Sequence, residues 1–207
     1  AKTRMHPWIR LNRVIRDIPI EYISGGCSQP NMRQSLSKIS NCRCIRCREV
    51  KGKEIKDYYK KIRTYNGSNS KEVFISYESS DEKIIYGFIR LRLPRYKYSE
   101  HVFKELHNSA LIRELHVYGK LNAVGEKLKG SQHKGIGSQL LKDAENYALK
   151  NGYCILSCIS GVGVRNFYRK RGYTITTKNG FVQKVVINPY LYTILYFIYN
   201  FIIKFIC

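Results

Sequence analysis

One stretch of the sequence decides the fold. It begins with Leu111-Ile-Arg-Glu-Leu-His-Val-Tyr118, continues after a loop with Gln132-His-Lys-Gly-Ile-Gly137, and ends with Ser160-Gly-Val-Gly-Val-Arg-Asn-Phe-Tyr-Arg-Lys-Arg-Gly-Tyr173. Residues 111–118 and 153–159 are predicted strands. The glycine-containing segment between them runs into an amphipathic helix whose apolar residues are Ile136, Leu140, Leu141, Ala144, Tyr147 and Ala148.

Two glycines mark the start of that helix. Gly135 and Gly137 leave main-chain N–H groups uncovered where the positive end of the helix dipole lies. Such donors form an anion site suited to a pyrophosphate, built from Gln132, His133, Lys134, Gly135, Ile136 and Gly137. The alternative is that both glycines only make a tight turn between strand and helix.

The order of these elements resembles the GNAT acetyltransferase superfamily, with Asn166-Phe-Tyr168 and Gly172-Tyr173 closing the motif. Within it, Arg113-Glu-Leu-His-Val-Tyr-Gly119, Gln132-His-x-Gly135 and Ile159–Tyr173 resemble the acetyltransferase half of the Elongator catalytic subunits. These radical-SAM and acetyltransferase enzymes act on the wobble uridine of tRNA. The resemblance implies an α/β chain with the GNAT acyl-CoA N-acyltransferase fold, whose mixed sheet is mostly antiparallel.

Two flanking segments extend the resemblance from about Trp8 to about Val186. The motif that closes the radical-SAM barrel of that family resembles Arg10-Leu-Asn-Arg-Val-Ile-Arg-Asp-Ile-Pro19. The linker between the two domains of that family resembles Cys42-Arg-Cys-Ile-Arg-Cys-Arg-Glu-Val50. We therefore expect the end of a truncated radical-SAM domain in residues 1–24, a basic cysteine-containing linker in 25–70 and a GNAT domain in 71–187. The [4Fe-4S] cluster and S-adenosylmethionine are expected only in the full-length enzyme.

The resemblance also implies acetyl-CoA as the cofactor. Glu114, Leu115, His116 and Val117 would lie along the strand that pairs with the pantetheine arm, and Tyr168 would meet the thioester. A phenol can protonate a leaving thiolate, whose thiol has a pKa near about 8.5. Alternatively, Tyr168 is a core tyrosine. Phe167 departs from the family pattern, which commonly has a second tyrosine there.

Glu114 and His116 are the only plausible general bases in the strand, and residues two apart share one face. His116 could equally be a structural histidine. The family is thought to transfer an acetyl radical to uridine, and this chemistry does not require a base.

Three cysteines, Cys42, Cys44 and Cys47, are spaced closely enough to hold one ion. Structural zinc prefers four ligands, so the motif is one short. Candidates for the fourth are Cys27, His101, His107 and Cys158, and the sequence does not rank them. The resemblance implies zinc, and the alternative is three free thiols in a basic loop.

The formal net charge of +22 favours a polyanionic partner. Residues 1–63 contain 16 Lys or Arg against 5 Asp or Glu. A basic stripe near the cysteines suggests tRNA as the partner, and the family implies other Elongator subunits. The basic stripe consists of Arg43, Arg46, Arg48, Lys51, Lys53, Lys56, Lys60, Lys61 and Arg63.

The remaining chain is predicted to contain a β-rich run at residues 8–20, a helix near 54–63, a turn at 66–70 and strands at 72–77 and 84–93. Apolar residues alternate with more polar ones along the last of these strands, which favours a hairpin with one polar edge. Pro94 ends this strand. The tail, residues 188–207, is expected to form a hydrophobic helix. Its last 18 residues, 190–207, are almost wholly apolar and would span roughly 27 Å as a helix, close to the thickness of a bilayer core. We expect a cytoplasmic protein with reduced thiols and a tail anchor; the alternative is a terminal helix docked on the same protein.

These observations support three functions. The leading one is the acetyl-CoA-binding half of an enzyme that forms 5-carboxymethyluridine in tRNA. The second is a protein lysine N-acetyltransferase of the histone type. The third is a membrane-tethered tRNA-binding module without catalysis in this fragment.

Overall fold

The computed structural model describes residues 2–12, 19–28, 36, 41–51, 57–95, 103–118 and 135–187. Contacts between Cα atoms divide the chain into two compact units. The first unit contains Ala1–Lys61, Tyr77–Tyr86 and Tyr118–Gln132. The second contains Ile62–Ser76, Gly87–Val117 and His133–Cys207.

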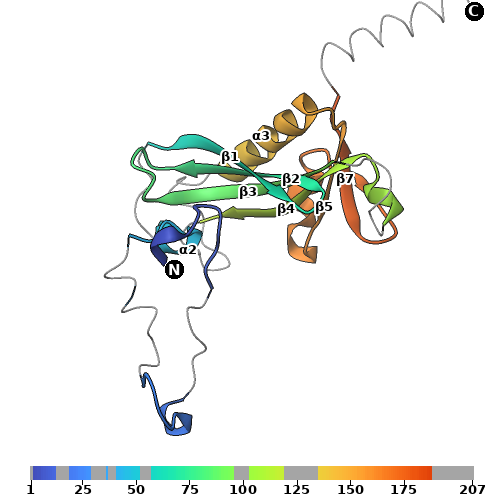
Figure 1. Cartoon of the computed structure of the whole chain (residues 1–207). Coiled ribbons are helices and arrows are strands. Elements are labelled where there is room, and N and C mark those ends of the chain that lie inside the picture. The colour runs from blue at the N-terminus through green and yellow to red at the C-terminus, as the bar shows by residue number, and fades with distance from the viewer. Residues whose placement is uncertain are drawn as a thin grey trace, which may run out of the picture. The chain divides into compact units, whose positions relative to one another are not determined.

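A seven-stranded mixed sheet forms the framework, with strand order β1-β2-β3-β4-β5-β7-β6 (Figure 1). Strands β4 and β5 run parallel, whereas β3 and β4, β5 and β7, and β6 and β7 pair antiparallel. This arrangement confirms the expected mixed α/β fold. The strands are β1 (Tyr59–Gly67), β2 (Ser70–Glu78), β3 (Ile85–Pro94), β4 (Ser109–Val117), β5 (Ile155–Ile159), β6 (Ile175–Thr176) and β7 (Phe181–Val185).

The helices are few, and one is long. They are η1 (Lys2–Arg4), η2 (Ile20–Tyr22), α2 (Ile45–Arg48), η3 (Lys104–Leu106), α3 (Ile136–Lys150), η4 (Val162–Val164) and α4 (Arg165–Arg169). Helix α3 places Ile136 and Leu140 so close to β3 that a Cβ on Gly87 would meet their side chains at 3.1 and 3.3 Å. Its apolar stripe is buried as the sequence predicts, except that Tyr147 is only half-buried.

The helix predicted near residues 54–63 is wrong in its described part, because β1 begins at Tyr59. Exposure alternates along this strand with a period of two, so that Lys61, Arg63 and Tyr65 are half-buried between exposed neighbours. This period is typical of a strand, and β1 pairs with β2 at the edge of the sheet. The predicted turn is confirmed at Ser68 and Asn69.

Strands β2 and β3 confirm the two strands predicted at 72–77 and 84–93, and β3 ends at Pro94 as expected. The predicted polar edge is wrong. Tyr86 and Phe88 are buried, and Arg90 and Arg92 are half-buried, because β3 is an inner strand with neighbours on both sides.

No strand is present in the described residues 2–12 and 19–28, so the β-rich run predicted at 8–20 is not found there. The backbone partner of Ile9 is instead Ile45, whose N–H donates to the Ile9 carbonyl at 2.9 Å. A strand needs a continuous backbone ladder with another strand, whereas this bond joins Ile9 to the first residue of helix α2. Residues 188–207 lie outside the described part. Among the described residues, no helix is both long and apolar enough to cross a membrane.

Candidate functional site

The first turn of α3 has the features of an anion site. Gly135 is the N-cap residue, with φ 114° and ψ −25°, in the left-handed region that favours glycine. Among the described residues, no side chain makes a capping hydrogen bond to this end, and the first turn of the helix contains no acidic residue. The first N–H groups of a helix lack carbonyl partners within it, so they remain available to an anion.

A guanidinium group lies at the same turn. Arg171 donates from Nε to Ser138 Oγ at 3.0 Å and from Nη1 to the Phe167 carbonyl at 2.7 Å, and its central carbon lies 3.7 Å from the centre of the Phe167 ring. This cation adds to the positive field at the helix start. Beside it opens a pocket of about 310 Å³ lined by Ser138, Leu141, Lys142, Glu145, Arg171 and Lys184.

Strands β4 and β5 are paired over only part of their length. Their ladder runs from Ser109–Ile155 to Ile112–Cys158, whereas β4 continues to Val117. Arg113 is an extra residue in β4, because Arg90 pairs with Glu114 and the next residue, Leu91, pairs with Ile112. A bulge of this kind bends the strand and changes the direction of the residues after it. Residues 113–117 therefore form the strand beside which an extended ligand could lie.

Glu114 and His116 both have partners on β3. The Glu114 carboxylate accepts a hydrogen bond from Arg90 Nε at 2.9 Å in a half-buried ion pair. The His116 ring is stacked on Phe88, with centroids 5.8 Å apart and planes 9° from parallel. The two side chains thus lie against neighbouring groups of β3, as expected for residues that share a face of the strand.

Tyr168 is 7% exposed and packs edge-to-face against Phe167 and Tyr173, with ring centroids 5.3 and 5.6 Å away. The thiol of Cys158 is near enough to its hydroxyl to affect the pKa of the phenol. Burial, together with Cys158, raises the pKa of the Tyr168 phenol. The group is therefore a neutral phenol at physiological pH, and it lies near Cys158, the last residue of β5 that pairs with β4.

The other residues expected at the cofactor are only partly described. Leu115 and Val117 are half-buried on β4, and a Cβ on Gly137 would meet Val117 at 3.4 Å and Phe167 at 3.5 Å. Gln132, His133 and Lys134 lie outside the described residues. The start of α3, the end of β4 and helix α4 nevertheless come together in the second unit.

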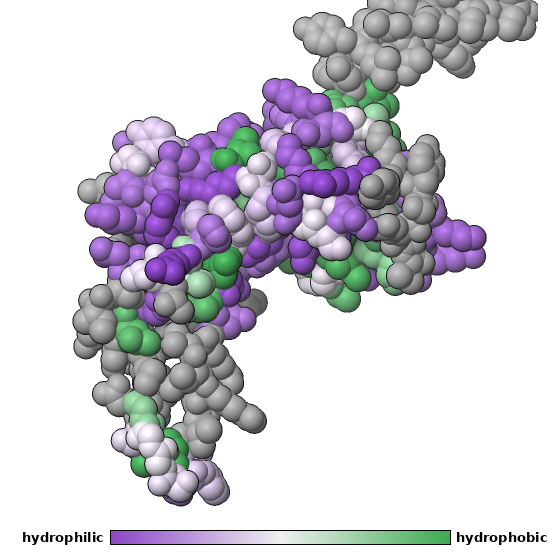
Figure 2. Space-filling view, in the orientation of Figure 1, coloured by the Kyte–Doolittle hydropathy of each residue, from purple (hydrophilic) through white to green (hydrophobic). Residues whose placement is uncertain are grey.

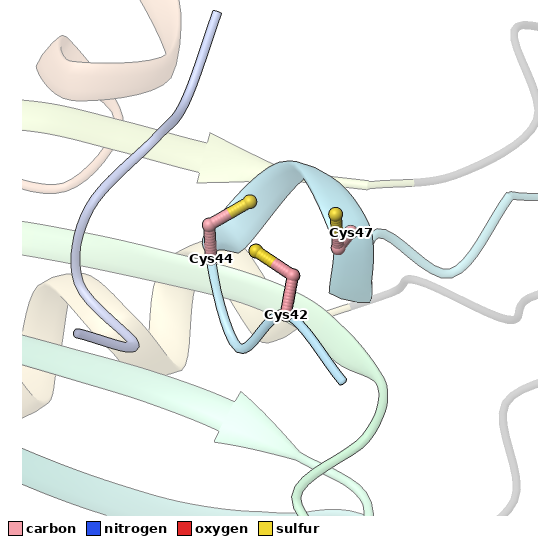
Figure 3. A group of neighbouring side chains, drawn as sticks. All are labelled: Cys42, Cys44 and Cys47. Carbon is pink, nitrogen blue, oxygen red and sulfur yellow. The ribbon is translucent and has the colours of Figure 1, made fainter. Parts of the chain in front are cut away.

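The cysteine cluster is in the first unit (Figure 3). Cys42 and Cys44 come from the turn before α2, and Cys47 comes from α2 itself. The three sulfur atoms lie within 4.8 Å of one another, and Cys42 and Cys44 are buried. Burial raises the pKa of the Cys42 thiol to about 11. At Cys44 burial has the same effect, but hydrogen bonds from the Cys47 N–H and the neighbouring thiols outweigh it and lower the pKa.

No fourth His, Cys, Asp or Glu in the described part of the chain joins this group. Of the four candidates, Cys27 is exposed, His107 follows η3, and Cys158 is buried on β5. His101 lies outside the described residues. Three ligands are thus placed together, as their spacing predicts.

Arg48 corrects the expectation of a continuous basic stripe. Its guanidinium is 4% exposed and bonds the fully buried Glu78 carboxylate at 2.8 Å. It also donates to the carbonyls of Arg43, Glu82 and Pro7 at 2.9, 3.1 and 2.8 Å. Arg48 therefore joins three segments of the first unit and is unavailable to a partner.

Other side chains of the basic stripe form ion pairs or hydrogen bonds within the chain. Arg43 and Lys61 both pair with Glu82, at 2.9 and 3.0 Å, and Arg63 donates to Ser76 Oγ at 3.2 Å. Lys53 and Lys56 lie outside the described residues. The visible surface over β1, β2 and β3 is nevertheless mostly hydrophilic (Figure 2).

Known proteins match this chain over most of its length. A tRNA uridine(34) acetyltransferase from Dehalococcoides mccartyi is 38% identical over 84% of this chain and 40% of its own. Elongator complex protein 3 from Homo sapiens is 37% identical over 82% of this chain and 33% of its own. An N-terminally truncated Elp3 from Methanocaldococcus infernus has a similar solved structure, with a TM-score of 0.70 and 32% identity over 89% of this chain and 46% of that one.

The chain therefore spans less than half the length of each of these relatives. Residues 41–173 match the acetyltransferase (GNAT) family. This match covers the cysteine cluster, the β4–α3 region and Tyr168, and it confirms the expected fold and family. The chain belongs to the acetyltransferase (GNAT) family.

Proposed function

We propose that this chain is the acetyl-CoA-binding half of an enzyme that modifies the wobble uridine of tRNA. The observation that carries the proposal is the arrangement in the second unit. The second unit contains a helix that begins at a glycine and has no capping side chain among the described residues. It also contains a strand that extends beyond its parallel neighbour, and a buried tyrosine near the last residue of that neighbour that is paired. The relatives named tRNA uridine(34) acetyltransferase and Elongator complex protein 3 support tRNA as the substrate.

Each part of the site has a distinct task. The N–H groups at Gly135–Gly137 and the Arg171 guanidinium would hold the pyrophosphate, with Gln132, His133 and Lys134 completing the loop. Residues Glu114–Val117 would offer main-chain groups to the pantetheine arm. Acetyl-CoA supplies the acetyl group as a thioester. Tyr168 would donate a hydrogen bond to the sulfur, a task that requires the neutral phenol.

Replacing Tyr168 by phenylalanine should slow acetyl-CoA turnover by about tenfold or more and leave its binding almost unchanged. Only the hydroxyl is removed, and general-acid assistance is typically worth about 10²–10⁴-fold at full effect. The measurement is acetyl-CoA consumption in the presence of tRNA, together with the dissociation constant for acetyl-CoA. Equal turnover by both proteins would assign Tyr168 to the core alone.

The protein lysine acetyltransferase is disfavoured by the state of Glu114. Such an enzyme needs a base to deprotonate the amine, and the Glu114 carboxylate is bound to Arg90. His116 is stacked on Phe88. Acetylation of a histone-type peptide without tRNA would restore this alternative.

The cysteine cluster is proposed to hold zinc. Three sulfur atoms within 4.8 Å of one another fit three positions of a tetrahedral site, whose fourth ligand is not assigned. Zinc would supply no step of the reaction there. Its role would be to tie Cys42 and Cys44 to α2, in the segment that Arg48 joins to the rest of the first unit.

Replacing Cys44 by serine should reduce the zinc content of the purified chain from about one equivalent to near zero. Cys44 is fully buried beside the other two thiols, and a hydroxyl is a poor zinc ligand. Elemental analysis of protein made without chelators gives the measurement, and Cys154→Ser, at an exposed cysteine, is the matched control. Absence of metal from the unmodified chain would contradict the zinc site.

The remaining proposals concern the domain boundaries, the partners and the location. A preceding radical-SAM domain would hold the [4Fe-4S] cluster and S-adenosylmethionine, with the linker at 25–70 and the GNAT domain at 71–187. Other Elongator subunits are proposed partners, as the name of the human relative suggests. A cytoplasmic location with a tail anchor at 188–207 stays a prediction from sequence.

A further inference from the structure

A buried carboxylate holds two arginines on the sheet of the second unit. The Glu72 side chain on β2 is 4% exposed, and its oxygen atoms lie 3.6 Å from Arg92 Nε on β3 and 3.2 Å from Arg113 Nη1 on β4. Ser70 Oγ donates to the same carboxylate at 3.1 Å. Glu72 therefore fixes guanidinium groups that come from two neighbouring strands.

Oxygen atoms near the turn between β1 and β2 fix these cations further and add a third. Arg92 donates from Nη2 to the Ser68 carbonyl at 2.9 Å. Arg95, which follows β3, donates from Nη2 to Asn66 Oδ1 at 2.7 Å. We call Arg92, Arg95 and Arg113 the arginine cluster. Its three positive charges surround one buried carboxylate, so the cluster as a whole is positive.

The arginine cluster keeps donors for a partner. A guanidinium group has five N–H donors in a planar fork, and the bonds described above occupy at most two of them in each arginine. The side chains of Arg92 and Arg113 are 33% and 46% exposed, and Arg95 is exposed. A fork that is fixed on one side and open on the other suits a phosphate, which it can contact through two parallel hydrogen bonds.

The arginine cluster lies beside the stretch of β4 that is proposed to hold the cofactor. Arg113 is the extra residue of the bulge and directly precedes Glu114, whose own charge is neutralised by Arg90. Side chains alternate along β3, so Arg92 points to the opposite face of the sheet from Gly87, which lies against α3. The cluster is therefore on the face away from the anion site of α3, where it would serve phosphates other than those of acetyl-CoA.

We propose that the arginine cluster binds phosphate groups of the tRNA substrate. This inference rests on the proposed function and assigns a contact surface to its substrate. Phosphate contacts position a nucleic acid without reading its sequence. Glu72 sets the direction of the forks of Arg92 and Arg113, and RNA bound there is positioned next to the stretch of β4 along which acetyl-CoA would lie.

The test is the salt dependence of tRNA binding by the whole chain, measured by fluorescence anisotropy with labelled tRNA. Arg95→Gln and Arg113→Gln each remove one charge from the cluster. We expect each to weaken binding about two- to fivefold. Each should also lower the slope of log affinity against log salt concentration by about one, because one fewer phosphate is neutralised. The two losses should multiply in the double variant.

Lys150→Gln is the matched control, because it removes one exposed charge at the end of α3, on the other face of the sheet. It should leave the salt slope unchanged. Arg113→Lys should keep the slope, since the charge remains, and still bind more weakly, since lysine has no planar fork. The side chain of Arg95 is bound at the surface, so Arg95→Gln should unfold in urea at the same midpoint as the unmodified chain.

The outcomes separate this inference from the function on which it rests. Unchanged salt slopes in Arg95→Gln and Arg113→Gln, or an equal loss in Lys150→Gln, would overturn the proposal. Competition by polyglutamate as strong as by unlabelled tRNA would overturn it in favour of an acidic protein partner, and absence of tRNA binding by the unmodified chain would overturn it too. A chain that binds tRNA through the cluster and fails to bind acetyl-CoA would instead contradict the proposed function.

Discussion

Replacing Gly135 by glutamate is expected to abolish acetyl-CoA binding while the chain stays folded. A Cβ at this position would meet no atom of the described residues within 4 Å, which leaves room for a side chain among them. Its carboxylate would occupy the anion site at the start of α3 and repel the pyrophosphate. The left-handed backbone, with φ 114°, adds strain of about 1–2 kcal/mol for any residue with a side chain. The measurement is isothermal titration with acetyl-CoA.

A glutamine at the same position is the matched control. Gly135→Gln carries the same backbone strain and nearly the same bulk, but no charge. We expect it to bind more weakly than the unmodified chain and at least about tenfold more tightly than Gly135→Glu, because it lacks the repulsion. If the glutamate variant binds acetyl-CoA as well as the unmodified chain, the anion site is wrongly placed.

The largest expected effect on stability comes from Glu78→Gln. The Glu78 carboxylate is fully buried and neutralises Arg48, which is 4% exposed. With glutamine there, the guanidinium stays buried among three carbonyl groups without a counter-charge. Breaking a buried pair by changing one partner typically costs about 3–5 kcal/mol in the free energy of unfolding. Urea unfolding followed by circular dichroism should show a midpoint shifted to lower denaturant.

Glu82→Gln provides the comparison on the same hairpin. Its carboxylate pairs with Arg43 and Lys61 at a more exposed position, and such pairs are worth at most about 1 kcal/mol. The Glu82 carbonyl, which accepts from Arg48, is unchanged by this substitution. Similar losses of stability in Glu78→Gln and Glu82→Gln would mean that burial of the Arg48 pair is not what stabilises this unit.

Much of the second unit follows from local sequence signals. Helix α3 has a strong apolar period and two glycines at its start, and β4 and β5 are short apolar runs that flank it. The place of Tyr168 follows from its short separation in the sequence from β5. These signals act within a few residues, so they can be recognised before any tertiary contact is known.

The features that sequence reasoning missed depend on distant partners. Strand β1 is polar enough to resemble an exposed helix, and its pairing with β2 decides its structure. Arg48 resembles its basic neighbours until Glu78, thirty residues away, is placed against it. Arg171 reaches Ser138 across 33 residues. A lone arginine in a basic sequence gives no sign of which carboxylate or hydroxyl it will meet.

The cysteine cluster shows the same limit. The spacing of Cys42, Cys44 and Cys47 predicts that their thiols converge, and they do. The fourth ligand requires a residue brought in by the fold, and sequence offered four candidates without a way to rank them. None of those candidates that lies in the described part of the chain joins the three thiols.

The most direct test of the central claim is isothermal titration of the whole chain with acetyl-CoA, in the presence and absence of tRNA. We predict binding of one acetyl-CoA per chain in both cases. The reason is that the anion site, the part of β4 that does not pair with β5, and Tyr168 belong to one unit. A titration that shows no acetyl-CoA binding under either condition would contradict the account.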